Sequence, residues 1–308
     1  MRFQFIVNKN ANFYFFLHNL AECEWPWPYR PWNNKTWKKE LGEFSREEKK
    51  ALKRFKKIYR NHFLKIYLGK PFFLRKNPWQ ALRKKIPSKE LEDLKSVFSI
   101  WQEKFEKIYE KDLPNLKKWE KMLTKEMKKN ERISVMRLFQ EIVEKLYKSS
   151  FPRGKIKIYL MLCGRPGACG GERGRGLDSN RILLELSRRL FNESMDYVIG
   201  VLCHEITHNC SHCYLQPLLL KVLKSQKKAR HIEELINRTL TPIGIFSIRF
   251  LNGRLPLSLT GKNDPIGKIN PTQTVRIINL TDRYIKEKKA IDARYIKELL
   301  QILKKGRL

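Results

Sequence analysis

Apolar residues recur at helical spacing through most of the first 150 residues. From Ser45 onward, Leu52, Phe55 and Ile58 alternate with basic residues, and Ser45 and Glu48 have the spacing of a capping box. We therefore expect a helix from this point to about Leu68. Three more helices are predicted, and they open at Pro87, at Pro114 and at Arg132. Residues 1–150 are thus predicted to form a mainly helical region rich in lysine.

The pattern changes after residue 151. Residues 155–162 alternate apolar and polar positions, which predicts a half-buried strand, and residues 181–186 predict a second one. A glycine-rich loop, residues 164–176, lies between them. Helices are predicted from Asn192 or Ser194 through residue 208, over 218–240 and over 281–304. Residues 151–308 therefore predict a second domain, and the chain as a whole belongs to the α+β class.

The composition supports a folded chain with a large positive charge. Hydrophobic residues make up 42% of the 308 residues, and 65 Lys and Arg face only 31 Asp and Glu, a formal charge of +34. Residues 1–150 carry 36 basic and 18 acidic side chains, so the excess is spread over both halves. Spread charge indicates solvated helix faces, with a weak, nonspecific attraction to nucleic acid or anionic surfaces.

Six cysteines and the first twenty residues bear on the compartment. Lys9 and His18 interrupt the first apolar stretch, which lacks a cleavage site of small residues, so it resembles no secretory signal. No apolar run approaches the 18 residues that a membrane span requires. We therefore expect a cytoplasmic protein with reduced thiols.

The sequence His204-Glu205-Ile206-Thr207-His208 carries the most specific chemistry. Residues four apart lie on one face of a helix, so His204 and His208 can bind the same metal ion. Glu205 is then placed to act as the general base that takes a proton from water. The motif predicts one catalytic Zn²⁺.

A strand, a glycine-rich turn, a second strand and an H-E-x-x-H helix together resemble the active-site half of the zincin metallopeptidases. The resemblance covers about residues 155–245. It implies a small mixed sheet, whose edge strand pairs with extended peptide substrate, and hydrolysis of peptide bonds. It also implies a third protein ligand for zinc.

Three positions could supply that third ligand. His212 would lie about 12 Å from His204 along one helix, too far to share a metal unless the helix breaks. The metzincin pattern needs Gly and His where this chain has Ser211 and Tyr214. A gluzincin-like ligand would be Glu233 or Glu234 on the following helix. A helical wheel places Glu233 closer to the apolar stripe, so Glu233 is the predicted ligand and Glu234 the alternative.

Other residues have predicted supporting roles. Asn237, one turn after Glu233, could form a hydrogen bond with a ligand histidine. Tyr214, His231 and Arg238 are candidates for stabilising the oxyanion, and the sequence does not distinguish between them.

Two alternatives to a peptidase remain. Cys210 and Cys213 could form a structural zinc site with Cys163 and Cys169 in a basic, nucleic-acid-associated protein. The densest basic run, residues 49–60, would then be its binding face rather than a solvated face. The second alternative is an inactive zincin fold that serves as an interaction module.

Overall fold

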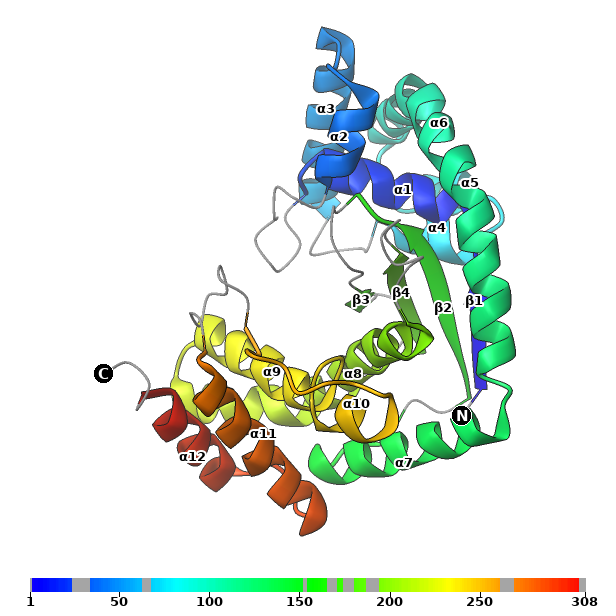
Figure 1. The fold of residues 1–308 in the computed structure, drawn as a ribbon. Helices are drawn as coiled ribbons and strands as arrows, with labels where there is room; N and C mark the ends of the chain where they lie inside the picture. The colour runs from blue at the N-terminus through cyan, green and yellow to red at the C-terminus, as the bar shows by residue number, and fades with distance from the viewer. Residues whose placement is uncertain are drawn as a thin grey trace. The chain divides into compact units, whose positions relative to one another are not determined.

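The computed structural model describes eight stretches of the chain (Figure 1), which are residues 2–23, 34–62, 68–151, 154–164, 171–173, 180–186, 194–260 and 269–304. They form two compact units. Unit 1 contains residues 1–3, 125–156 and 193–308, and unit 2 contains residues 4–124 and 157–192. The boundary expected at residue 150 lies inside one segment of unit 1.

The sheet has four strands in the order β1-β2-β4-β3, and its strands are β1 (Arg2–Ile6), β2 (Lys155–Leu162), β3 (Gly171–Arg173) and β4 (Arg181–Leu186). Strands β2 and β4 are parallel, with Leu160 opposite Leu184, whereas β3 is antiparallel to β4. Both strands predicted from the sequence are confirmed, and the sheet is mixed. With helices dominating the rest, the chain belongs to the α+β class, as predicted.

The helices of unit 2 surround an aromatic core, and they are α1 (Lys9–Leu20), α2 (Lys35–Leu41), α3 (Arg46–His62), α4 (Lys70–Leu74), α5 (Pro78–Arg83) and α6 (Ser88–Glu126). Phe16, Trp101 and Phe105 are fully buried, and the ring of Phe16 contacts the rings of both Trp101 and Phe105. The capping box at Ser45 and Glu48 is present in both directions, as predicted. Large buried rings of this kind contribute strongly to the stability of a core.

One buried asparagine ties the first helix of unit 2 to the sheet. The side chain of Asn12 donates to the carbonyl of Leu160 over 3.1 Å and accepts from the amide of Leu162 over 2.7 Å. It therefore satisfies two backbone groups of β2 inside the core, where an unpaired polar group would be costly.

The helices of unit 1 are α7 (Asn130–Leu146), α8 (Met195–Leu223), α9 (Gln226–Leu240), α10 (Ile245–Phe250), α11 (Pro271–Lys286) and α12 (Ala293–Lys304). Helix α8 packs against α9 along much of its length, as Figure 1 shows in yellow-green and yellow. The helix that carries the two histidines belongs to this unit, whereas the sheet lies almost entirely in unit 2. The substrate-binding edge strand that the zincin resemblance implies therefore stays a prediction.

Three predicted helix boundaries are wrong. Pro114 does not open a helix but lies inside α6, and Pro217 lies inside α8, which ends at Leu223. A proline removes one backbone hydrogen bond, and burial of residues such as Leu116 and Leu219 on either helix offsets that loss. The helix expected over residues 281–304 is two helices, α11 and α12.

The described residues contain no helix with both the length and the apolar character that a bilayer crossing requires.

Candidate metal centre

Helix α8 places the two histidines of the motif side by side. Its first turn is capped by Ser194, whose hydroxyl accepts from the amide of Tyr197, and it continues without a break past Asn209. The Nε2 atoms of His204 and His208 lie 3.2 Å apart. The unbroken helix keeps His212 two turns from His204, so His212 is excluded as a ligand on backbone geometry; its side chain lies outside the described residues.

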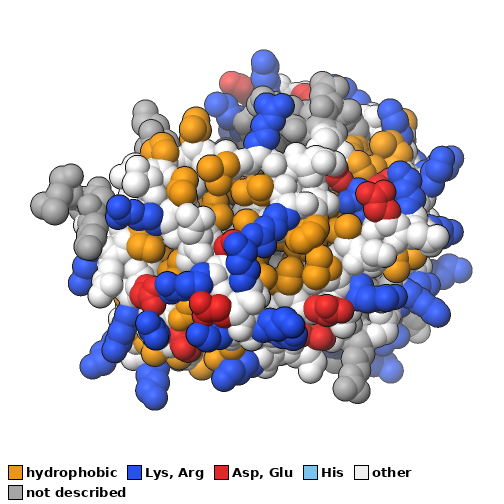
Figure 2. All heavy atoms as spheres, turned by 60° about the horizontal axis from the view of Figure 1, so that its bottom comes forward, with side chains coloured by type: hydrophobic (Ala, Val, Ile, Leu, Met, Phe, Trp, Pro, Cys, Tyr) orange, Lys and Arg blue, Asp and Glu red, His pale blue; other side chains and the backbone are white. Residues whose placement is uncertain are grey.

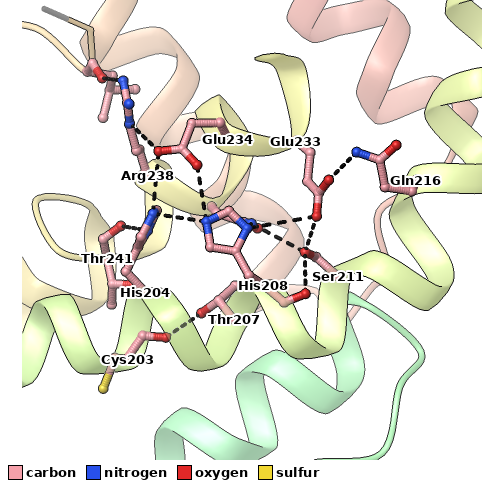
Figure 3. A network of polar contacts seen from close by, with 12 residues as sticks. Cys203, His204, Thr207, His208, Ser211, Gln216, Glu233, Glu234, Arg238 and Thr241 are labelled. Carbon is pink, nitrogen blue, oxygen red and sulfur yellow. Dashed lines mark hydrogen bonds and ion pairs between the residues drawn. The ribbon is translucent and has the colours of Figure 1, made fainter. Parts of the chain in front are cut away.

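Glu234 on α9 completes a group of three potential ligands (Figure 3). Its Oε1 lies 3.4 Å from Nε2 of His204, and its Oε2 lies 3.1 Å from Nε2 of His208. One ligand atom from each residue lies within 4.8 Å of the other two, and this is the only such group of three among the described residues. Two imidazoles and one carboxylate therefore converge from two adjacent helices.

The prediction that Glu233 is the third ligand is wrong in this arrangement. The carboxylate of Glu233 accepts hydrogen bonds from Ser211, over 2.7 Å, and from Gln216, and its nearest oxygen is 3.9 Å from Nδ1 of His208, on the far side of the ring from Nε2. The side chain of Glu233 is 8% exposed, while that of Glu234 is 26% exposed. The wheel located the buried stripe correctly, but the carboxylate that meets Nε2 of both histidines is that of Glu234, which lies farther from the stripe.

The orientation of His204 is fixed by a backbone group. Its Nδ1 lies 2.8 Å from the carbonyl oxygen of Thr241, the residue that ends α9. A carbonyl can only accept, so Nδ1 carries a proton, and Nε2 is the nitrogen that faces Glu234. This contact was not predictable, because the sequence marks Thr241-Pro242 only as a helix stop.

His208 is held by a buried polar network. Asn237 places its side-chain nitrogen 3.0 Å from Nδ1 of His208 and 3.2 Å from the hydroxyl of Ser211. The hydroxyl of Tyr147 donates to the side-chain oxygen of Asn237 over 2.8 Å. The predicted hydrogen bond between Asn237 and a ligand histidine is confirmed, whereas Ser211, Gln216 and Tyr147 were not identified from the sequence as site residues.

The charges of the group are strongly coupled. Burial alone would lower the pKa of His208, but hydrogen bonds with Glu233 and Glu234 raise it well above its usual value. Burial would raise the pKa of Glu234, but the charge of His204 and hydrogen bonds with both histidines lower it well below its usual value. The carboxylate of Glu234 is therefore ionised, and its negative charge favours a positive charge on the adjacent histidine rings.

The donor set suits a transition metal. Nitrogen and carboxylate oxygen are the ligands that Zn²⁺ binds in hydrolytic enzymes, usually as three protein groups with one open position. His204 in particular has its second nitrogen committed to a backbone acceptor, as ligand histidines commonly do. We conclude that these three residues could hold a metal ion.

Glu205 and Arg238 lie close to this group. Glu205 is 6% exposed, and its negative charge contributes to the raised pKa of His208. Arg238 donates from Nε to Glu234 over 2.9 Å and from Nη1 to the carbonyl of Leu259 over 3.2 Å. Of the three oxyanion candidates, Arg238 is therefore beside a ligand, while the hydroxyl of Tyr214 donates to the carbonyl of Ile291.

The cysteines do not form a described metal group. Cys203 is fully buried beside Met136, and burial raises the pKa of its thiol far above the usual value. Cys210 is buried and Cys213 exposed, both in unit 1, while Cys163 donates to Glu185 in unit 2. Cys169 lies outside the described residues, so the predicted structural site that includes it stays a prediction.

Compared with protein-family models, curated proteins and solved structures, the chain shows no significant match to any of them.

Proposed function

We propose that this protein is a zinc-dependent peptidase of zincin type. The observation that carries the proposal is the convergence of His204, His208 and Glu234 within 4.8 Å, with Glu205 next to the first ligand in sequence. A metal ion bound there would lower the pKa of a bound water and polarise a substrate carbonyl.

Residues of the chain would carry out proton transfer, ligand orientation and charge stabilisation. Glu205 accepts a proton from water and returns it to the leaving amine, a role that a carboxylate beside a metal ligand can perform without binding the metal. The carbonyl of Thr241 keeps Nε2 of His204 available, and Asn237 orients the ring of His208. Arg238 fixes Glu234 and is our candidate for stabilising negative charge on the substrate oxygen.

The first experiment is elemental analysis of purified wild type, His204→Ala and Glu205→Gln, combined with turnover of a fluorogenic peptide library. We expect about one zinc per chain in wild type and Glu205→Gln, and none in His204→Ala. Only the wild type should cleave peptides, and a chelator should abolish that activity.

Three outcomes would contradict the proposal in different ways. Zinc that survives His204→Ala would place the metal elsewhere, for example on the cysteines. Peptide cleavage that survives in Glu205→Gln would remove Glu205 as the general base. Zinc that is lost in His204→Ala, with no wild-type turnover across the library, would favour the inactive zincin module instead.

A further inference from the structure

The positive charge of unit 2 is not spread evenly over its helices. From residue 49 to the end of α3 at residue 62 there are seven Lys and Arg and no Asp or Glu. The long helix α6 of the same unit carries nine basic and nine acidic side chains. A solvated, salt-bridged surface helix has the composition of α6, and α3 does not. The face drawn in Figure 2 resembles α6 in this respect, because basic side chains (blue) and acidic side chains (red) are interspersed on it.

The basic side chains of α3 form a continuous stripe in water. Arg46, Lys50, Lys53, Lys57 and Arg60 are exposed and follow one another at intervals of three or four residues, which keeps them on one face. From Arg46 to Arg60 the stripe extends about 21 Å along the helix axis.

Most of this charge has no acidic counterpart among the described residues. Of the five stripe residues, Arg46, Lys50 and Lys53 form no ion pair there, whereas Lys57 acts on the carboxylate of Glu90. Arg54, off the stripe, pairs with Asp93 of α6. Like charges four residues apart, such as Lys49 and Lys53, repel one another and destabilise a helix. A polyanion on this face would relieve that repulsion.

The opposite face of α3 fixes the helix in place. Leu52, Phe55, Ile58 and Tyr59 are all at most 8% exposed, and Tyr14 of α1 contacts the ring of Phe55. The stripe is therefore presented on a helix that is packed into the core of the unit, not on a mobile tail.

The same packing restricts the kind of partner. No large apolar or aromatic side chain of α3 is exposed, so this face has nothing to insert into a lipid bilayer or to stack on an unpaired base. What it offers is a row of cations at regular spacing, which matches the phosphate backbone of a nucleic acid duplex.

We propose that the exposed face of α3 binds the phosphate backbone of double-stranded nucleic acid without sequence preference. This activity is independent of the metal centre, because α3 belongs to unit 2 and the three ligands belong to unit 1.

The test is the salt dependence of binding to a fluorescein-labelled 30-bp duplex of mixed sequence, measured by anisotropy on the full chain. The test variant neutralises four stripe positions, and its substitutions are Arg46→Gln, Lys50→Gln, Lys53→Gln and Lys57→Gln. A control variant removes the same charge from exposed lysines of α6 that form no described ion pair, and its substitutions are Lys89→Gln, Lys107→Gln, Lys118→Gln and Lys121→Gln.

The stripe variant should bind at least about tenfold more weakly at 0.15 M salt, and its slope of log K against log salt should be smaller by about 3 to 4. The control variant should change the slope by less than about 1. A second duplex of different sequence should bind equally well, and Glu205→Gln should bind like the wild type.

Equal losses in the two variants would overturn the proposal, because they would show that diffuse charge carries the binding. Absence of duplex binding by the wild type at 0.05 M salt would overturn it as well. Binding to anionic lipid vesicles that is lost in the stripe variant, with duplex binding retained, would assign the face to membranes instead. Circular dichroism of each variant confirms that the helices remain folded.

Discussion

His204 donates from Nδ1 to the carbonyl oxygen of Thr241 over 2.8 Å, so the residue directly after α9 orients the ring of a residue on α8. The contact turns Nε2 of His204 toward Glu234, which also comes from α9. Helix α9 and its C-cap residue therefore supply both a potential metal ligand and the group that orients a second one. The geometry of the centre therefore depends on how α9 is rotated against α8.

Substituting each of the two adjacent glutamates by glutamine should show which of them binds the metal and which only positions His208. Glu234→Gln should weaken zinc binding by at least about a hundredfold, because an anionic ligand is lost. Glu233→Gln should weaken it by only about tenfold, since Glu233 acts through Ser211 and His208. Competition with a chromogenic chelator gives both affinities. The reverse order would restore Glu233 as the ligand.

Removal of the side-chain amide of Asn237, which contacts His208, should weaken metal binding without abolishing it. Asn237→Ala is expected to lower zinc affinity by about 10- to 100-fold, the usual effect of losing a group that orients a ligand. Tyr147→Phe, which removes only the hydroxyl that donates to Asn237, should have a smaller effect in the same direction.

Gln140→Ala serves as the control for that pair. Gln140 forms a side-chain hydrogen bond with Glu144 on α7 and touches none of the three ligands. Its substitution should leave zinc affinity unchanged. A loss as large as that of Asn237→Ala would mean that unit 1 is generally sensitive to polar truncation.

Metal removal should lower thermal stability through linkage. At a free zinc concentration about 100 times Kd, binding to the native state alone stabilises it by about 2.7 kcal/mol. For a unit of this size the melting temperature should fall by roughly 5–10 °C after chelation, as calorimetry would record. Glu234→Gln should melt at the same temperature with and without the metal; a persistent shift there would point to zinc bound at another place.

We expect the stability of unit 2 to depend on pH through the buried carboxyl group of Asp112. Burial raises its pKa from 3.8 to about 6, against a smaller opposing effect of Lys111. The native state therefore holds this proton more tightly than the unfolded chain, and stability is lost as pH rises from about 4 through 6. Asp112→Asn removes that loss, so it should raise the melting temperature at pH 8 by a few degrees and have no effect near pH 4.

An exposed carboxylate on the same helix provides the comparison for Asp112. Glu110→Gln changes the charge by the same amount at a solvated position. It should leave the pH profile of the melting temperature unaltered. A gain for Glu110→Gln equal to that of Asp112→Asn would attribute the effect to net charge rather than to burial.

The sequence by itself determined the features that depend on local spacing. The alternation in residues 155–162 and the short apolar run in residues 181–186 predicted both strands, and the spacing of His204 and His208 predicted two imidazoles on one helix face. The capping box at Ser45 is equally local. Each of these is set by residues within a few positions of one another, so no knowledge of packing was needed.

Only the tertiary structure decided which features of the chain meet. The choice between Glu233 and Glu234 depends on how Leu235 and Ile236 rotate α9 as they are buried in unit 1, and a wheel drawn on one helix contains no information about its neighbour. The continuation of α6 through Pro114 was decided in the same way, by burial that offset a local cost. The Thr241 carbonyl shows the reason most directly: every residue has a backbone carbonyl, so only the fold can select one to face His204.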